Sequence, residues 1–189
     1  MIKEGLDMVS NEKLDGIIRR LAEGSNEAKR VFYEETAKLL QAISRSYLKD
    51  QDVSDAVHDF MLGAHIKAKR YRTNTNPRAW LIKTYSNFLK NRIKKNQKYR
   101  CEPLTENICA TRAEDDIENV DRRADVFLIM RGLKAYDRYL LISYHWGGLS
   151  YAEIGMQLHK PKSTIQSQLE RIHKNLRKKE LNLRTKDEF

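Results

Sequence analysis

Apolar positions recur at three- and four-residue spacing along most of the chain, which is the period of an amphipathic α-helix. The first such stretch ends at the residues EGSNE, where Gly24 and Ser25 break the pattern. A second helix is predicted around the apolar positions of 31–43, and a third over about 53–68. The apolar stripe of the first helix consists of Leu14, Ile17, Ile18 and Leu21.

The loop RYRTNTN precedes a fourth predicted helix. Asn76 can accept a hydrogen bond from a free N–H group of the first turn, and Pro77 fits the position where no hydrogen bond is lost. The helix then separates an apolar side from a side of lysines and asparagines. The apolar side comprises Leu81, Ile82, Tyr85, Phe88, Leu89 and Ile93, and the polar side comprises Lys83, Asn87, Lys90, Asn91 and Lys94.

Two further helices are predicted near the C-terminal end. Ser150 and Glu153 form a capping-box pattern that begins the first, and Ser163 and Gln166 offer a second capping box shortly after Pro161. Two helices joined by three or four residues form a helix-turn-helix, although a helical hairpin of an unrelated bundle stays an alternative. The apolar positions of this pair are Ile154, Leu158, Ile165, Leu169, Ile172 and Leu176.

Residues from about 99 to 121 show no sustained period and are interpreted as a linker. The pattern therefore predicts an all-α protein with two small helical domains, residues 1–100 and 127–189, joined by a flexible acidic linker over 101–126.

Charge changes this picture because it is divided unevenly along the chain. Residues 61–100 contain twelve basic and no acidic side chains, whereas residues 101–126 contain three basic and eight acidic ones. A merely solvated face normally mixes both signs, so the basic block favours binding to a polyanion. The predicted second helix of the helix-turn-helix adds residue types that meet phosphates and base edges in a major groove.

Composition excludes several other classes of protein. With 33% charged residues and no apolar run of the roughly 20 residues that a bilayer requires, no membrane insertion is expected. The N-terminus lacks the apolar core of a signal peptide, so a cytoplasmic location is predicted. Cys101 and Cys109 have no companion Cys or His pair at zinc-site spacing, and free thiols are predicted with no metal site.

At the level of motifs, the segment GLSYAEI followed by PKSTIQSQL resembles region 4 of bacterial sigma factors of the sigma-70 family. The segments DVSDAVHDFMLGAHIKAKRY and PRAWLIKTYSNFLKNRIKK resemble helices of region 2 in the same family. The order of the segments, with no long domain between them, is similar to the small two-domain type with extracytoplasmic function. The resemblance covers about residues 14–100 and 127–180.

The resemblance implies a protein that works by recognition and strand separation, without a catalytic side chain or a cofactor. Its implied partners are core RNA polymerase, through the clamp helices of the largest subunit and the beta flap, promoter DNA in a bacterial cytoplasm, and an anti-sigma factor. Candidate polymerase contacts are Asp55, His58 and Asp59, which could instead only cap or solvate a helix. The implied minus-ten contacts are Tyr71, Asn74, Thr75, Asn76, Arg78, Lys83, Asn87 and Lys90, and the implied minus-thirty-five contacts are Lys162, Ser163, Thr164, Gln166, Ser167 and Arg171.

Several positions depart from the resembled pattern. His58 and Asp59 replace the usual glutamine and glutamate, and Asn91 stands where an aspartate is common. Gly147 occupies a position that is often acidic, and His159 replaces the glycine of the turn. These departures alter details of docking and of the turn, but no chemical step depends on them.

Two rival functions remain open at this point. A stand-alone helix-turn-helix regulator would bind DNA without polymerase, and it predicts a dimerisation helix that the pattern does not supply. A metal-dependent nuclease would use Asp50, Asp52, Asp55 and Asp59 as ligands, but no Lys or Arg pattern for phosphoryl transfer surrounds them.

Overall fold

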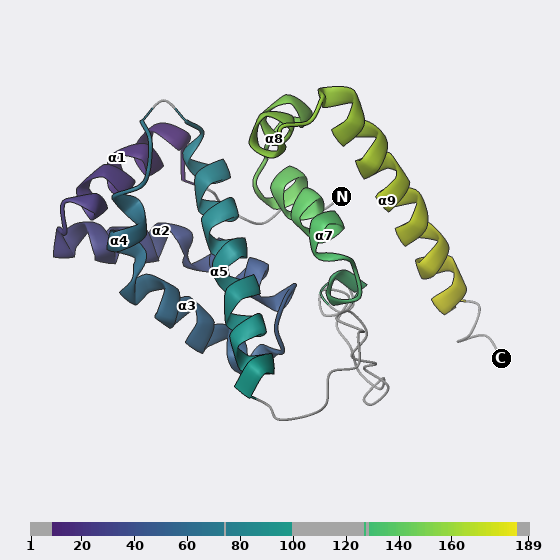
Figure 1. Ribbon diagram of the computed structural model, residues 1–189, viewed down its shortest axis with the longest axis horizontal. Helices are drawn as coiled ribbons and strands as arrows, with labels where there is room; N and C mark the ends of the chain where they lie inside the picture. Colours follow the sequence, from purple (N-terminus) through teal and green to yellow (C-terminus); the bar gives the residue numbers. More distant parts are fainter. Residues whose placement is uncertain (1–8, 74, 100–126, 128, 185–189) are drawn as a thin grey trace.

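The computed structural model describes residues 9–73, 75–99, 127 and 129–184, and within these ranges the chain forms helices and connecting loops without a β-strand (Figure 1). The all-α prediction is therefore confirmed. In chain order the elements are α1 (Asn11–Ala22), α2 (Asn26–Arg45), the 3₁₀-helix η1 (Asp50–Asp52), α3 (Val53–Leu62), α4 (Ala64–Ala68), α5 (Pro77–Tyr99), α7 (Ala135–Leu141), the π-helix η2 (Ile142–Trp146), α8 (Tyr151–Leu158) and α9 (Lys162–Arg184).

Helices α1 to α5 form the N-terminal half of the molecule. The predicted stripe of α1 is buried completely, and α1 packs against α2, α4 and α5. Ser10 and Ser25 cap α1 and α2 by accepting hydrogen bonds from Lys13 N at 3.3 Å and Ala28 N at 3.2 Å. The predicted break lies at Gly24, whose φ of 87° falls in the left-handed region that glycine enters without steric cost.

The segment predicted as one helix over 53–68 consists of two helices separated by Gly63. Glycine weakens a helix because it loses the most backbone freedom on folding. The prediction of a continuous helix is wrong at this residue, and the apolar side chains on either side of it, such as Phe60 and Ala64, are nevertheless buried.

Helix α5 begins at Pro77 as predicted, and Asn76 Oδ1 accepts a hydrogen bond from Ala79 N at 3.0 Å. The Tyr85 ring lies edge-on to Phe60, with 4.7 Å between ring centroids, and the Tyr85 hydroxyl is hydrogen-bonded to that of Ser44. Burial raises the pKa of Tyr85 to about 12. These contacts join α2, α3 and α5 around one core.

In the C-terminal half, α7 runs directly into η2, and α8 and α9 follow with a three-residue turn between them. Ser150 and Glu153 form both hydrogen bonds of the predicted capping box. His159 takes the left-handed conformation, with φ of 52° and ψ of 45°, where the resembled pattern has glycine.

The second predicted capping box is absent. Helix α9 begins earlier, because Ile165 N already donates to the carbonyl oxygen of Pro161 at 3.3 Å and Pro161 supplies a backbone preset for the first turn. Ser163 and Gln166 therefore lie inside the helix with their side chains exposed.

The two halves share one continuous apolar core, in which α5 packs against η2 and α8 (Figure 1). The predicted linker, residues 101–126, lies outside the described residues, as do Cys101 and Cys109.

Candidate nucleic-acid interface

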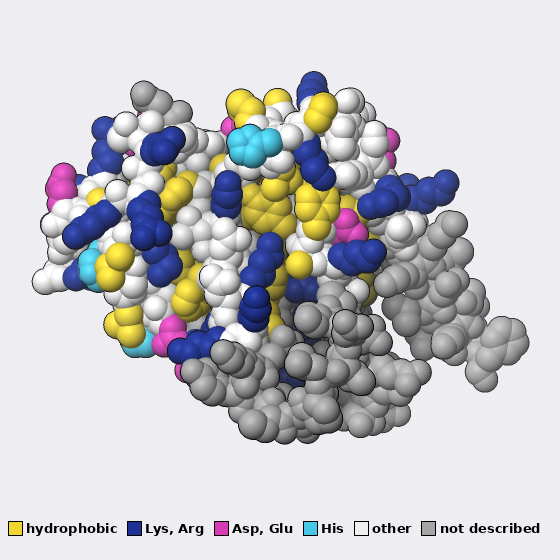
Figure 2. All heavy atoms as spheres, in the orientation of Figure 1, with side chains coloured by type: hydrophobic (Ala, Val, Ile, Leu, Met, Phe, Trp, Pro, Cys, Tyr) yellow, Lys and Arg dark blue, Asp and Glu magenta, His cyan; other side chains and the backbone are white. Residues whose placement is uncertain are grey.

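The carboxylate-free stretch 61–100 supplies α4, the following loop and α5. Lys83, Asn87 and Lys94 are exposed and follow one another at spacings of four and seven residues along α5, so they form one stripe. Figure 2 shows Lys and Arg side chains over much of this face of the molecule and far fewer Asp and Glu side chains. A surface of this kind attracts a phosphate backbone.

Lys90 belongs to the same stripe but is half-buried. Its Nζ lies 5.9 Å from the centroid of the Tyr139 ring of α7. Burial, and then the neighbouring Arg138 guanidinium, lower the pKa of Lys90. In this arrangement Lys90 therefore faces the C-terminal half of the chain, in contrast to Lys83 and Lys94.

The predicted base-capture loop is anchored at its first residue. The Tyr71 hydroxyl donates to Asp15 Oδ1 at 2.6 Å, and the ring lies edge-on to Trp80 with 5.3 Å between centroids. Burial and then the hydrogen bond to Asp15 raise the pKa of Tyr71 to about 12. Thr75 Oγ1 donates to the Arg72 carbonyl at 2.7 Å, and Asn74 lies outside the described residues.

Asn76 ends this loop and has two partners. While its Oδ1 caps α5, its Nδ2 donates to Glu153 Oε1 of α8 at 2.7 Å. Burial acts to raise the pKa of Glu153, but hydrogen bonds from Ser150 and Asn76 outweigh it and lower that pKa. Arg78, one turn into α5, donates from Nη2 to the Val9 carbonyl at 2.6 Å.

Helix α9, the second helix of the helix-turn-helix, buries its apolar stripe and exposes the opposite face. Ser163 and Ser167 are joined by a hydrogen bond from Ser167 Oγ to the Ser163 carbonyl at 2.8 Å, and Gln166 Nε2 donates to Glu170 Oε1 at 3.0 Å. The exposed side chains near the start of the helix are Lys162, Ser163, Gln166, Ser167 and Glu170, with Thr164 partly buried.

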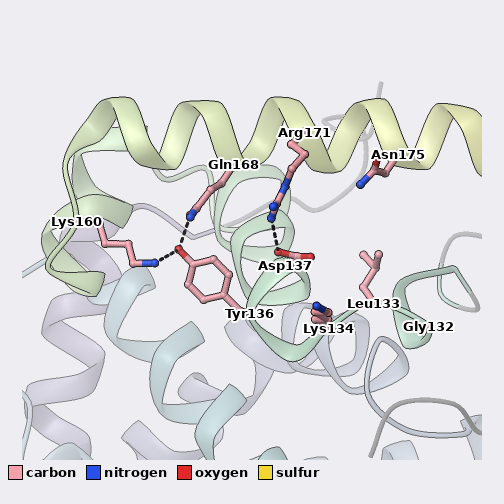
Figure 3. A pocket seen from close by; sticks show the side chains of 9 residues that line it. All are labelled: Gly132, Leu133, Lys134, Tyr136, Asp137, Lys160, Gln168, Arg171 and Asn175. Carbon is pink, nitrogen blue, oxygen red and sulfur yellow. Dashed lines mark hydrogen bonds and ion pairs between the residues drawn. The ribbon is translucent and has the colours of Figure 1, made fainter. Parts of the chain in front are cut away.

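Arg171 lies on a different side of α9 from Gln166, because five residues correspond to about 140° around a helix. Its Nη2 lies 3.8 Å from Asp137 Oδ1 of α7, across a pocket of about 550 Å³ (Figure 3). In the same pocket the Tyr136 hydroxyl donates to Gln168 Oε1 at 2.6 Å and accepts from Lys160 Nζ at 3.1 Å. Arg171 and Gln166 therefore cannot occupy the centre of one DNA-facing surface together.

A pair of histidines joins α9 to η2. The Nε2 atoms of His145 and His173 lie 2.9 Å apart, which requires that one of the two nitrogens accepts a hydrogen bond. Burial, and then the nearby Arg177 charge, lower the pKa of His173. The pair therefore favours the neutral form of His173.

This arrangement predicts that acid weakens the fold. Because the folded pKa of His173 lies below its unfolded value of about 6.5, the unfolded chain binds more protons. The stability that neutral His173 contributes is therefore complete above that pH. It is lost as the pH falls through the folded pKa of His173. We expect the Tm to drop between about pH 7.5 and 5.5, and the drop to be smaller in His173→Asn. An equal drop in both proteins, measured by thermal unfolding, would assign the pH dependence to other groups.

The predicted polymerase contacts lie along α3. Asp55, His58 and Asp59 are exposed, and Asp59 is paired with Arg92 of α5. Their face continues with two exposed apolar side chains that the sequence interpretation missed, Leu62 at 64% and Ile66 at 58% exposure. The sequence did contain a signal for an exposed Leu62, because this residue lies seven positions after Asp55 and outside the apolar stripe of α3.

The carboxylates that a metal-dependent nuclease would use as ligands are paired with arginines or dispersed, and they do not converge on one point. Asp50 Oδ1 lies 3.7 Å from Arg45 Nε, and Asp59 is held by Arg92. In the part of the chain that the structure describes, no group of three or more His, Cys, Asp and Glu side chains is arranged to hold a metal ion. Likewise, none of the described helices is both long and apolar enough to cross a bilayer.

Comparison with known proteins agrees with this arrangement. Residues 32–99, which span most of α2 through α5, match the family described as Sigma-70 region 2. The chain is also 24% identical over 174 residues to the ECF RNA polymerase sigma factor SigK of Mycobacterium ulcerans, and the alignment covers 88% of this chain and 93% of that protein. Residues 32–99 thus form a Sigma-70 region 2 domain, and the chain as a whole is similar to an RNA polymerase sigma factor of the ECF type.

Proposed function

We propose that this chain directs core RNA polymerase to promoters, holds the opened strand of the minus-ten element and reads the minus-thirty-five element as duplex. The observation that supports the proposal is that one chain carries two different surfaces whose charge and shape suit nucleic acid. The α4–α5 surface is basic and bordered by a polar loop, which suits a single strand, whereas α8–α9 is a capped helix-turn-helix, which suits a major groove.

The minus-ten role is assigned to the loop Tyr71–Asn76 and to the α5 stripe. Phosphates are held by Lys83, Lys90 and Lys94, with Arg78 and Asn87 beside them, and the amide and hydroxyl groups of Asn74, Thr75 and Asn76 read an unstacked base. Tyr71 acts mainly as the anchor of the loop, because its hydroxyl and its ring are already engaged by Asp15 and Trp80.

The minus-thirty-five role is assigned to the exposed side of α9. Lys162, Ser163, Gln166 and Ser167 point away from the buried stripe near the N-terminus of the helix, where the helix dipole also favours phosphate. Thr164 and Arg171 lie at the edge of this surface, so a backbone contact suits Arg171 better than a base contact.

Polymerase docking is assigned to the α3–α4 face. Asp55 and His58 offer exposed polar groups, and Leu62 and Ile66 add apolar area that water solvates poorly. Carboxylates beside exposed apolar side chains form a surface that pairs with a basic and apolar helical partner.

Purified protein tests the function directly. With core polymerase the chain should co-purify and support run-off transcription from promoters selected out of a genomic library. A stand-alone regulator would shift duplex DNA without polymerase and leave transcription unchanged, and a nuclease would cleave DNA in magnesium. Either of these outcomes, with no initiation, would overturn the proposal.

The salt dependence of single-strand binding checks the α5 stripe. Replacing both Lys83 and Lys94 with Ala should lower the slope of log affinity against log salt by about 0.7 per lost phosphate contact. Lys29→Ala with Lys38→Ala on α2 provides a control of equal charge change outside the basic block. An unchanged slope in the α5 variant, measured with minus-ten single strands, would show that these lysines do not hold phosphates.

A further inference from the structure

The two histidines that join η2 to α9 belong to none of the surfaces assigned to DNA or polymerase. The Nε2 atoms of His145 and His173 lie 2.9 Å apart, and their ring centroids lie 5.1 Å apart with 62° between the ring planes. Both side chains are half-buried, so solvent still reaches the rings. Two imidazole nitrogens, supplied by residues 28 positions apart in the sequence, therefore meet at the edge of the C-terminal half.

The distance between the two nitrogens fits a shared metal ion. An imidazole nitrogen binds a divalent transition metal at about 2.0–2.1 Å. Two such nitrogens 2.9 Å apart subtend an angle of about 90° at the ion. This is the angle between neighbouring ligands in the square-planar or tetragonal geometry of Cu²⁺ and Ni²⁺. A tetrahedral Zn²⁺ would need the nitrogens about 3.3 Å apart, so the observed spacing favours Cu²⁺ or Ni²⁺.

The backbone around His145 is unusual in a way that is common at binding sites. In the π-helix η2 the Gly147 N–H donates to the Ile142 carbonyl, five residues earlier, at 2.9 Å. Such wide turns are rare and occur frequently at functional sites. The turn buries Trp146 while the adjacent His145 stays partly open to solvent. One turn of backbone thus supplies a core residue and a potential ligand side by side.

Neighbouring side chains hold the His145 ring in place. The Tyr144 ring lies edge-on to it with 5.0 Å between centroids, and Tyr144 in turn stacks on Tyr151 of α8, also at 5.0 Å. On the other side, His173 projects from α9 next to Ile172, which is buried. Ligands that are already ordered lose little side-chain freedom when an ion binds, so the pair is prepared for binding.

The charges around the pair set its affinity. Metal ions bind the neutral imidazole, and burial, followed by the Arg177 charge, lowers the pKa of His173. The exposed Arg177 guanidinium also repels a cation, which limits the affinity. Glu170, three residues before His173, is hydrogen-bonded to Gln166 instead. Within the described residues no third His, Cys, Asp or Glu side chain joins the pair, so water completes the coordination.

We propose that His145 and His173 form a binding site for one Cu²⁺ or Ni²⁺ ion, which fastens α9 to η2. Each ring tilts so that its Nε2 lone pair points at the ion instead of at the other nitrogen. The ring that donates in the metal-free pair takes the Nδ1–H tautomer, so the neutral pair releases no proton. Because the ion binds the folded arrangement, it stabilises the packing of the helix-turn-helix. The site goes beyond the proposed function and does not depend on it.

Titration with NiCl₂ tests the site in the full chain, prepared without a histidine tag and with Cys101 and Cys109 replaced by Ser. This parent should bind one Ni²⁺, measured by calorimetry, and its Tm should rise with Ni²⁺ concentration. Mg²⁺, which prefers oxygen ligands, should leave the Tm unchanged. His145→Asn and His173→Asn should each weaken Ni²⁺ binding at least about tenfold, since even the loss of a residue that only supports a ligand costs about that much. The control is His58→Asn, at an exposed histidine of α3, which should bind like the parent.

Two further measurements distinguish a ligand from a residue that only supports the fold. Arg177→Ala keeps both histidines and removes the repelling charge, so it should tighten Ni²⁺ binding by about two- to fivefold at low salt. Electron paramagnetic resonance of bound Cu²⁺ should show two nitrogen ligands in the parent and one in His145→Asn, while circular dichroism verifies that the variant stays helical. Equal Ni²⁺ affinity in the parent and both histidine variants would mean an adventitious ion only, and would overturn the proposal.

Discussion

Replacing the loop that precedes α5 should abolish promoter opening while leaving polymerase binding intact. The sharpest variant exchanges residues 72–76 for glycines and serines with serine at 76, which preserves a helix cap, and it keeps Tyr71 and Pro77. Extruding a base costs a few kcal/mol of unstacking, and without polar groups to capture the base nothing offsets that cost. Permanganate reactivity of unpaired thymines measures opening, and we expect it to fall to background.

A second DNA template provides the control for the same loop variant. On a template whose minus-ten region is already mismatched open, the unstacking cost has been removed, so transcription should return. Binding to duplex minus-thirty-five DNA should also be unchanged, because no residue of α8 or α9 is replaced and Glu153 keeps its capping bonds to Ser150 when Asn76 is lost. A variant that melts a fully paired promoter as well as the parent would move the site of base capture elsewhere in the molecule.

Gln166→Ala should weaken binding to the minus-thirty-five duplex by about 1–3 kcal/mol and relax the preference at one base pair. The reason is its exposed place near the start of α9, four residues after Lys162. Arg171→Ala is the matched comparison from the same helix. Because Arg171 reaches toward Asp137, its loss should weaken binding similarly for all sequences and leave base preference unchanged.

Titrating both variants against a library of minus-thirty-five sequences distinguishes these effects. If Arg171→Ala changes base preference and Gln166→Ala does not, the two sides of α9 are assigned the wrong way round. If neither variant changes affinity, the helix meets DNA through other residues.

Features set by local chemistry were predictable from the sequence. The stripe of α1, the Asn76–Pro77 start of α5 and the capping box of α8 each depend on residues within one or two turns of one another. The second capping box failed for the same kind of reason, because Pro161 begins α9 before Ser163 can act as a cap.

Features set by distant contacts were not predictable. Lys90 reads as part of a solvent-facing stripe, and only the approach of Tyr139 shows that it is half-buried. Gly147 was visible as a departure from the resembled family, but its reason is the Ile82 side chain, 65 positions earlier, that fills the space. Arginine is a residue type that reads bases, yet the Arg171 side chain is directed toward Asp137 on another helix.

Because Asn76 caps α5, the hydrogen bonds that it can form with a DNA base are restricted. Its carbonyl oxygen already accepts a hydrogen bond from the Ala79 N–H at 3.0 Å, and its amide nitrogen donates to a carboxylate oxygen of Glu153 at 2.7 Å. The amide nitrogen keeps a second hydrogen to donate, so Asn76 is better suited to act toward DNA as a donor than as an acceptor. It should accept bases that present a lone pair, such as thymine O4 or guanine O6 and N7. If the base instead presented an exocyclic amino group, as adenine or cytosine does, two hydrogen-bond donors would face each other. One desolvated N–H would then stay unpaired, at a cost of about 1–3 kcal/mol.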